Sequence, residues 1–121
     1  MNTRKEKQHK VFVYGTLRQS KAATHRLYGY TMHLIRGGGF DFPAIQPSGN
    51  DNDVVLGNVL TVSDKQLKAL DQYEGVDGGL YTREHVRVQA IGQQEDVVAF
   101  AYVGGASIFP PRIQGGDWHS R

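Results

Sequence analysis

The pattern of apolar and polar positions along this chain predicts about five or six short strands and one helix. Val11–Tyr14 and Val97–Val103 are apolar throughout, which is typical of strands covered on both faces. Tyr81–Ile91 alternates instead, with Val86 and Val88 on one face and charged or polar side chains on the other. Two further segments are rich in β-forming residues and are also predicted to be strands, Tyr30–Ile35 and Val54–Val62.

The predicted helix follows the strand Val54–Val62. Ser63, with Gln66 three residues later, has the form of a capping box, in which side chains at the start of a helix bind free backbone N–H groups. Leu67 and Leu70 then supply an apolar stripe, and Gly75 stands where helices often end. Because neighbouring strands have short local connections, we expect a small mixed sheet that curls into a barrel with the helix on its flank.

The remaining segments are expected to lack strands or long helices. His25–Tyr28 is interpreted as a short helical turn, and Phe40–Asn50 as a loop with one extended piece. Gly104–Arg121 is rich in Gly and Pro, so we expect it to wrap over the surface and to be held there by Trp118.

Composition excludes several classes of protein. The chain has 121 residues, enough for a single domain with one core, and its 39% hydrophobic and 21% charged residues indicate a folded protein. A formal net charge of +2 requires neither a nucleic acid nor a membrane as partner. Cysteine is absent, which excludes disulfides, thiolate metal sites and a cysteine nucleophile.

The first ten residues differ from the rest of the chain. Residues 1–10 are mainly basic and polar, so we expect a disordered, solvated leader followed by a single domain over residues 11–121. A nucleic-acid-binding arm is the alternative, but this segment lacks interleaved aromatic side chains. It also lacks the apolar core of a signal peptide, and no apolar run approaches the roughly 18 residues of a membrane helix. A cytoplasmic location is therefore expected.

The turn after the first predicted strand is the first candidate for chemistry. In Tyr14-Gly15-Thr16-Leu17, the glycine permits a backbone conformation that aims consecutive N–H groups into one pocket. Such a cradle suits a carboxylate or an oxyanion. The alternative is a glycine turn with a structural role alone, as at the end of many strands.

Glu74 is the second candidate. On a helical wheel it lies between Leu67 and Leu70, within the apolar stripe. Burial and the negative end of the helix dipole both disfavour the ionised form, so its pKa is expected to rise, which suits a general acid and base near neutral pH. Alternatively, the helix end frays and Glu74 faces solvent, or it pairs with Arg83 or Arg87.

Three other kinds of residue bear on the prediction of a site. Asp71 is next on the wheel and either shares the site or acts as a local cap or surface charge. Tyr81 either lines a pocket or packs in the core. The five histidines show no spacing typical of metal ligands.

At these positions the chain resembles the γ-glutamylcyclotransferase-like family, and its small bacterial and γ-glutamylamine subgroup in particular. The two main matching motifs are Phe12-Val13-Tyr14-Gly15-Thr16-Leu17-Arg18 and Leu70-Asp71-Gln72-Tyr73-Glu74-Gly75. The supporting pieces are Tyr81-Thr82-Arg83, Val86-Arg87-Val88, Phe42-Pro43-Ala44, Gly57-Asn58-Val59-Leu60 and Gly116-Asp117-Trp118. Together they extend over roughly residues 11 to 118.

The resemblance implies an α+β fold, a small mixed β-barrel of about five to six strands with one or two flanking helices. It implies an enzyme that cleaves a γ-glutamyl amide to 5-oxoproline and a free amine by intramolecular aminolysis. Glu74 would be the catalytic acid and base, and Tyr14, Gly15, Thr16, Leu17 and Tyr81 would bind substrate. No metal or organic cofactor is implied. The expected partner is a small γ-glutamyl compound, with no nucleic acid or membrane, and the expected state is a monomer or small homo-oligomer.

A second function fits the same residues. A protein that binds or sequesters a small molecule would keep the pocket without turning its ligand over. Both functions place a ligand in the cradle of the turn, but only an enzyme requires Glu74 to exchange protons.

Overall fold

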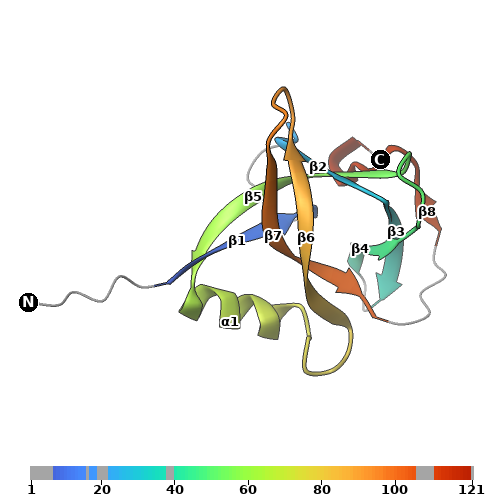
Figure 1. The fold of residues 1–121 in the computed structure, drawn as a ribbon. Helices are drawn as coiled ribbons and strands as arrows, with labels where there is room; N and C mark the ends of the chain where they lie inside the picture. The colour runs from blue at the N-terminus through green and yellow to red at the C-terminus, as the bar shows by residue number, and fades with distance from the viewer. Residues whose placement is uncertain (1–6, 16, 19–21, 38–39, 106–110, 121) are drawn as a thin grey trace, which may run out of the picture.

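The structure is a computed structural model that describes residues 7–15, 17–18, 22–37, 40–105 and 111–120. Within these residues, five strands close into a barrel in the order β1-β5-β2-β6-β7 (Figure 1). Neighbouring strands pair antiparallel except β1 and β7, whose parallel pairing at Val11 and Phe100 closes the barrel. The barrel strands are β1 (Gln8–Val13), β2 (His25–Tyr28), β5 (Val54–Ser63), β6 (Tyr81–Ala90) and β7 (Asp96–Gly104).

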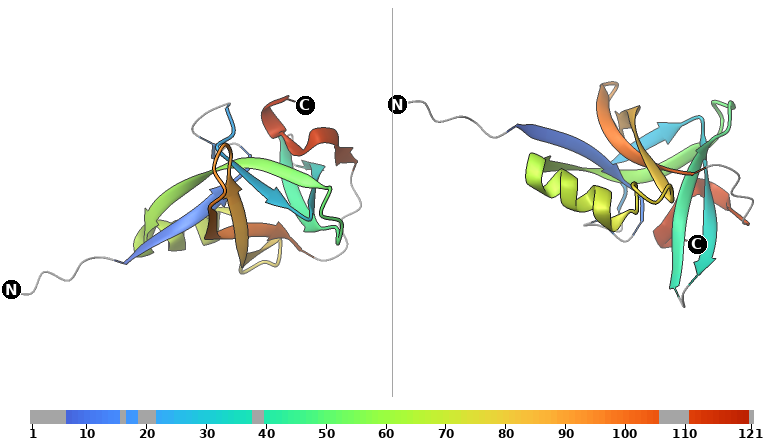
Figure 2. Two further views of the ribbon diagram at one scale, coloured as in Figure 1. Left: turned by 45° about the horizontal axis from the view of Figure 1, so that its top comes forward. Right: turned by 90° about the horizontal axis from the view of Figure 1, so that it is seen from below.

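A smaller antiparallel sheet packs beside the barrel. Its strand order in the described residues is β4-β3-β8, so β4 is an edge strand. The strands are β3 (Tyr30–Gly37), β4 (Phe40–Pro47) and β8 (Arg112–Ile113), and the last is followed by two short 3₁₀ helices, Gln114–Gly116 and Trp118–Ser120. Figure 2 shows this sheet and the helix on different sides of the barrel.

The helix α1 (Asp64–Tyr73) begins with the predicted capping box. The Gln66 N–H donates to the Ser63 side chain, and the Ser63 N–H donates to the Gln66 side chain. Its buried residue, Leu67, packs on the outer face of the barrel. No helix in the described part of the chain is long and apolar enough to span a membrane.

Apolar side chains fill the molecule on both sides of the barrel wall. Alternate residues of each strand point to opposite faces of a sheet. Phe12 therefore points into the barrel core with Val86 and Val88, whereas Val11 and Val13 point outward, beneath α1. A pocket lies beside this outer layer, and Phe12 and Val13 of β1 line it, so β1 contributes both to the core and to the pocket.

The predicted barrel with a flanking helix is confirmed, but two segments were misjudged. His25–Tyr28 is strand β2 rather than a helical turn, because it pairs with β5 on one side and β6 on the other. Phe40–Pro47 is strand β4 rather than a loop. Its prolines discouraged that assignment, but an edge strand tolerates them because one side of its backbone needs no ladder partner.

The ends of the domain also carry small differences. Strand β1 begins at Gln8, three residues earlier than predicted, so Gln8–Lys10 belong to the barrel rather than to the expected leader; residues 1–6 lie outside the described part. Near the other end, Trp118 is buried as expected. The tail also reaches the segment after β1, since the Asp117 carboxylate accepts a hydrogen bond from Arg18 at 2.7 Å.

Candidate active site

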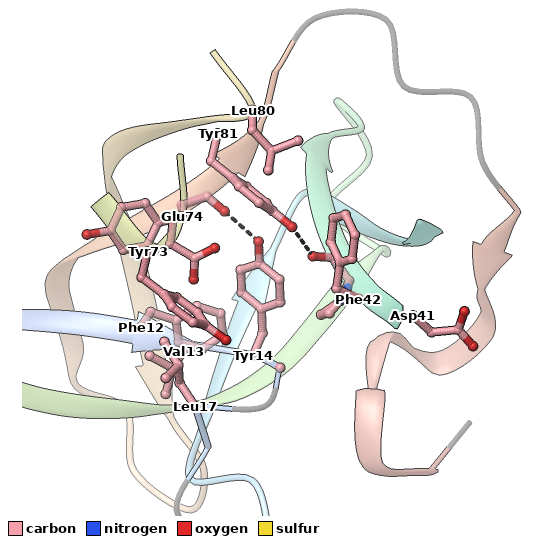
Figure 3. A pocket seen from close by; sticks show the side chains of 13 residues that line it. Phe12, Val13, Tyr14, Leu17, Asp41, Phe42, Tyr73, Glu74, Leu80 and Tyr81 are labelled. Carbon is pink, nitrogen blue, oxygen red and sulfur yellow. Dashed lines mark hydrogen bonds between the residues drawn. The ribbon is translucent and has the colours of Figure 1, made fainter. Parts of the chain in front are cut away.

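A pocket of about 380 Å³ opens beside the end of β1 (Figure 3). Four parts of the chain form it: the end of β1 with the turn after it, strand β4, the stretch from the end of α1 to the start of β6, and strand β7. The described lining residues are Phe12, Val13, Tyr14, Gly15, Leu17, Asp41, Phe42, Pro43, Tyr73, Glu74, Leu80, Tyr81 and Tyr102. The turn and Glu74, far apart in the sequence, thus border one cavity.

Glu74 is fixed by its place at the end of α1. It is the C-cap residue, and its N–H donates to the Leu70 carbonyl at 2.8 Å, which keeps the backbone helical to this point. Figure 3 shows its half-buried side chain directed into the pocket, toward Tyr14. Among the described residues, its carboxylate has no hydrogen-bond or ion-pair partner. Burial raises its pKa from 4.5 to about 7, so the group is partly protonated at neutral pH.

The arginines that were considered as partners of Glu74 bind other carboxylates. Arg83 donates to Asp71 at 2.7 Å, and Arg87 lies 4.0 Å from Asp96. Asp71 also accepts a hydrogen bond from the Tyr102 hydroxyl at 2.7 Å. Asp71 is therefore engaged in a structural cluster rather than facing the pocket, whose lining does not include it.

The turn after β1 is tightly packed against β4. A Cβ atom added at Gly15 would lie 2.7 Å from the Pro43 side chain, so a larger residue would push the two walls of the pocket apart. The Arg18 N–H donates to the Gly15 carbonyl at 3.1 Å and closes the turn. Leu17 lines the pocket, whereas Thr16, also predicted to bind substrate, lies outside the described residues.

Arg18 anchors this turn from behind. Its side chain is fully buried, and its guanidinium donates to the Asn58 side chain at 3.0 Å and to the Asp117 carboxylate at 2.7 Å. Hydrogen bonds of this kind between charged groups are stronger than neutral ones. The turn is thereby tied to β5 and to the tail of the chain.

Two buried tyrosines form the pocket wall opposite Glu74. The Tyr14 hydroxyl donates to the Tyr102 carbonyl at 2.5 Å, and the Tyr81 hydroxyl donates to the Pro43 carbonyl at 2.6 Å. Burial raises the pKa of both phenols, and the nearby Glu74 charge acts in the same direction. Both hydroxyls therefore stay neutral and bound to the backbone, which suits them to shaping the pocket rather than to accepting a proton.

Comparison with known proteins bears on what this pocket does. The chain matches the family described as "Gamma-glutamyl cyclotransferase, AIG2-like" over residues 11–120. The protein belongs to this family. A comparison with curated proteins found no match. The family is thus as the sequence motifs suggested, whereas the γ-glutamylamine subgroup stays a prediction.

Solved structures share the γ-glutamyl cyclotransferase-like fold. An Arabidopsis thaliana protein aligns with a TM-score of 0.65 at 24% identity, over 85% of this chain and 72% of that one. A protein described as a gamma-glutamyl cyclotransferase aligns with a TM-score of 0.69 at 18% identity, over 81% and 67% of the two chains. A Mus musculus AIG2-like protein aligns with a TM-score of 0.68 at 20% identity, over 88% and 86%. At these identities the likeness shows the fold alone.

Several pocket residues of this cyclotransferase-family protein were not singled out as site residues from the sequence. Phe42 and Pro43 come from β4, within a segment whose sequence predicts a loop with one extended piece, although both belong to a motif that supports the resemblance. Tyr73 and Leu80 each immediately precede a predicted site residue, and this adjacency was the available signal. Tyr102 lies on a strand whose sequence predicts apolar cover on both faces, so the sequence gives no sign that this tyrosine lines a pocket.

The described residues contain no cluster of three or more His, Asp or Glu side chains placed to hold a metal ion. The acidic side chains in the described pocket lining are Glu74, at the end of α1, and Asp41, on β4. What the lining offers is therefore one carboxyl group of raised pKa within a largely apolar and aromatic enclosure.

Proposed function

We propose that the protein is a γ-glutamyl cyclotransferase that releases 5-oxoproline and a free amine from a γ-glutamyl amide. One observation carries this proposal: Glu74, half-buried and with a pKa of about 7, faces a cavity that also contains the turn after β1. Family membership supplies the reaction class, because the family includes γ-glutamyl cyclotransferases.

The reaction needs a folded substrate more than it needs a protein nucleophile. The α-amine of the glutamyl group attacks its own γ-carbonyl carbon and closes a five-membered ring. A cavity that holds the two groups in contact can contribute about 7–11 kcal/mol to such a step in favourable cases. The aromatic and aliphatic walls around Tyr14 and Phe42 would provide this confinement and keep water away.

Glu74 would carry the proton. Its carboxylate form takes a proton from the attacking amine, and its acid form then gives a proton to the leaving nitrogen as the amide C–N bond breaks. A pKa of about 7 makes both forms available at neutral pH, which is the condition for efficient general acid–base catalysis. Asp71 cannot easily replace it, because its oxygens already bind Arg83 and Tyr102.

The turn after β1 would bind the charged or developing negative oxygen. Backbone N–H groups of Gly15 and Leu17 are candidates to hold the substrate α-carboxylate, or to stabilise the oxyanion formed during attack. Arg18 would support this role by fixing the turn to β5 and to Asp117.

The test is to incubate the protein with γ-glutamyl amines, γ-glutamyl amino acids and glutathione, and to measure 5-oxoproline by chromatography. At least one compound should react, and Glu74→Gln, which keeps size but cannot exchange the proton, should lower kcat about 10²–10⁴-fold. Glu95→Gln is the matched control, because Glu95 is exposed and absent from the pocket lining.

Equal turnover by Glu74→Gln and the parent would overturn the assigned role. If compounds bind but release no 5-oxoproline, the protein would instead be a small-molecule binding or sequestering protein that uses the same pocket. Calorimetric titration of the same panel distinguishes these outcomes.

A further inference from the structure

Asn58 of β5 binds two points of the segment that joins β1 to β2, which begins with the turn after β1. Its side-chain oxygen accepts a hydrogen bond from the Arg18 Nε–H at 3.0 Å, and its side-chain N–H donates to the Ala22 carbonyl at 3.3 Å. The segment meets the same strand again near its end, where the Thr24 N–H donates to the Gly57 carbonyl at 3.0 Å. Strand β5 therefore supports this segment at several points along its length.

Strand β5 reaches this position because Gly57 lets it pass close to β1. A Cβ atom added at Gly57 would lie 2.4 Å from the Val13 carbonyl oxygen and 2.7 Å from the Phe12 ring. In the antiparallel register of the two strands, Asn58 is the partner of Val13, the last residue of β1. The buried Asn58 amide is thus placed where β1 ends and the turn begins.

Asp117 holds the same guanidinium from the tail, residues 112–120. One of its carboxylate oxygens accepts hydrogen bonds from Arg18 Nη1 at 2.7 Å and from the His119 N–H at 3.0 Å, and the other accepts from the Ser120 hydroxyl at 3.1 Å. Burial alone would raise the pKa of this carboxyl, but the hydrogen bonds outweigh it and lower the pKa below its ordinary value. Asp117 is therefore ionised at neutral pH and fixed in orientation.

The residues on either side of Asp117 seat the tail on the barrel. Trp118 is buried in the barrel core. Gly116 has a φ of 64°, and a Cβ atom added there would lie 1.9 Å from the Val54 carbonyl oxygen, so the tail lies against β5 only because this residue is glycine. Because both of its neighbours are docked, Asp117 reaches Arg18 from a rigid support.

The two acceptors together fix the plane of the Arg18 guanidinium. They bind different nitrogen atoms of a rigid planar group, Nε on the β5 side and Nη1 on the tail side. The side chain is fully buried, so bulk water would not replace a lost partner. Arg18 directly follows Leu17 of the pocket lining, and its own N–H closes the turn on the Gly15 carbonyl. A shift of the guanidinium therefore moves the backbone that borders the pocket.

We propose that Asn58 and Asp117 are positioning residues: through Arg18 they hold the turn after β1 in the conformation that binds the carboxylate of the substrate. Neither residue lines the pocket, so each acts without touching substrate. Because coupling between two sites is reciprocal, a ligand in the pocket also strengthens the docking of the tail. The inference rests on the proposed function and adds to it a distant part of the chain on which substrate binding depends.

Steady-state kinetics on the panel compound with the highest kcat/KM test the first part of the inference. Asp117→Asn keeps the size of the side chain but removes the charge that orients Arg18, so KM should rise about tenfold, within the usual range of coupling between sites. The value of kcat should change less than about threefold, because the Glu74 carboxyl is held by α1 and not by the turn. The dissociation constant of 5-oxoproline, measured by calorimetry, should rise with KM.

Asp53→Asn is the matched control. It breaks another ion pair of the tail, in which Arg112 binds Asp53 at 2.6 Å, and neither of these residues lines the pocket. KM should therefore stay within about twofold of the parent. A tail that mattered for stability alone would give Asp53→Asn and Asp117→Asn similar kinetics.

Relocating the charge separates positioning from a simple loss of stability. In the double variant Asn58→Asp with Asp117→Asn, the carboxylate lies on the β5 side of the guanidinium and an oxygen acceptor remains on each side, so KM should return to within about threefold of the parent. Arg18→Lys keeps the charge but cannot present the same planar fork to both acceptors. It should raise KM several-fold, and it tests the inference even if Asp117→Asn does not fold.

Hydrogen exchange followed by mass spectrometry tests the second part. In the parent, saturating 5-oxoproline should slow exchange of the backbone N–H groups of residues 112–120 by about threefold or more. The same addition should leave tail exchange unchanged in Arg18→Lys, in which the connection is broken. It should act on Asp53→Asn as it acts on the parent.

The inference is overturned if Asp117→Asn leaves KM unchanged, if its loss is confined to kcat, or if Asp53→Asn raises KM equally. Tail exchange that 5-oxoproline does not slow in the parent overturns the second part. If the parent releases no 5-oxoproline from any panel compound, the proposed function fails, while the dissociation constants and the tail exchange still decide this inference. A parent that binds neither 5-oxoproline nor a panel compound overturns both.

Discussion

The two ends of α1 satisfy their polar groups in different ways. At the first end, Ser63 and Gln66 bind each other's backbone N–H groups at 3.2 Å and 2.8 Å, so all partners lie within four residues. At the last end, Glu74 has a capped backbone but a carboxylate without a partner among the described residues, and the pocket that it faces is lined by residues of β1, β4, β6 and β7.

The contacts that stabilise α1 and the group that it offers for chemistry therefore lie at opposite ends of the helix. The capping box stabilises the helix through local contacts, and the side chains that form it are already engaged with each other's backbone N–H groups. The far end leaves a carboxyl group half-buried, which costs stability when the group ionises, and gives it a pKa of about 7. Asp71, one turn earlier, shows the same helix placing a carboxylate where Arg83 and Tyr102 fully engage it.

The largest expected effect comes from moving the Glu74 carboxyl while keeping its chemistry. Glu74→Asp shortens the side chain by one methylene and draws the acid back toward the helix. Because proton transfer needs contact with the reacting nitrogen, we expect kcat for 5-oxoproline release to fall about 100-fold. Single-turnover assays would show whether chemistry is the slowed step. Activity equal to the parent would mean that the position of this acid is not critical.

The second largest effect is expected on the free energy of unfolding, which should depend on pH through the Glu74 carboxyl. The folded protein binds a proton at Glu74 more tightly than the unfolded chain, so stability should be lost as pH rises from 4.5 to about 7. Allowing for partial exposure, the loss is on the order of 2 kcal/mol. Urea denaturation should show Glu74→Gln matching the parent near pH 4.5 and exceeding its stability near pH 8. A constant difference across this range would contradict the assignment.

Asp71→Asn should act in the opposite sense to Glu74→Gln at neutral pH. It removes the charge that Arg83 binds in a half-buried pair, and we expect a loss of about 1.5 kcal/mol in the free energy of unfolding. Turnover should change far less than in Glu74→Asp, because Asp71 does not line the pocket. Thermal unfolding and the 5-oxoproline assay on one preparation compare the two carboxylates directly.

The smallest effect is expected at the first end of the helix. Ser63→Ala removes the side chain that accepts the Gln66 N–H, a change that costs about 1 kcal/mol at such positions. The kcat for any reactive substrate should stay within about twofold of the parent, because this end is remote from the pocket lining. A much larger loss of activity than of stability would show that the two ends are coupled.

The same contrast explains what the sequence could predict. The capping box, the apolar strands and the inward place of Glu74 depend on residues close together in the chain, so spacing alone indicated them. The pairing of β2 with β5 and β6 depends on distant strands, and its short polar sequence gave little sign of it. The edge position that allows prolines in β4 also depends on the arrangement of strands that are distant in the sequence.

For the site, one wall was predictable and the opposite wall was not. Glu74 and the turn at Gly15 stood out by residue type and position. Phe42 and Pro43 enter the pocket only because β4 packs beside the barrel, where the Pro43 carbonyl accepts the Tyr81 hydroxyl. Tyr102 enters because alternate residues of β7 face outward, and a run of apolar residues does not say which face is hollow.

The anchoring of Arg18 makes the last residues of the tail relevant to the pocket. A chain cut before Asp117 would take a carboxylate away from a guanidinium that is fully buried behind the turn. The loss would weaken the anchor of the turn at Gly15 and Leu17, about a hundred positions earlier in the chain. Truncations that remove Asp117 therefore belong among the changes that reach the candidate active site.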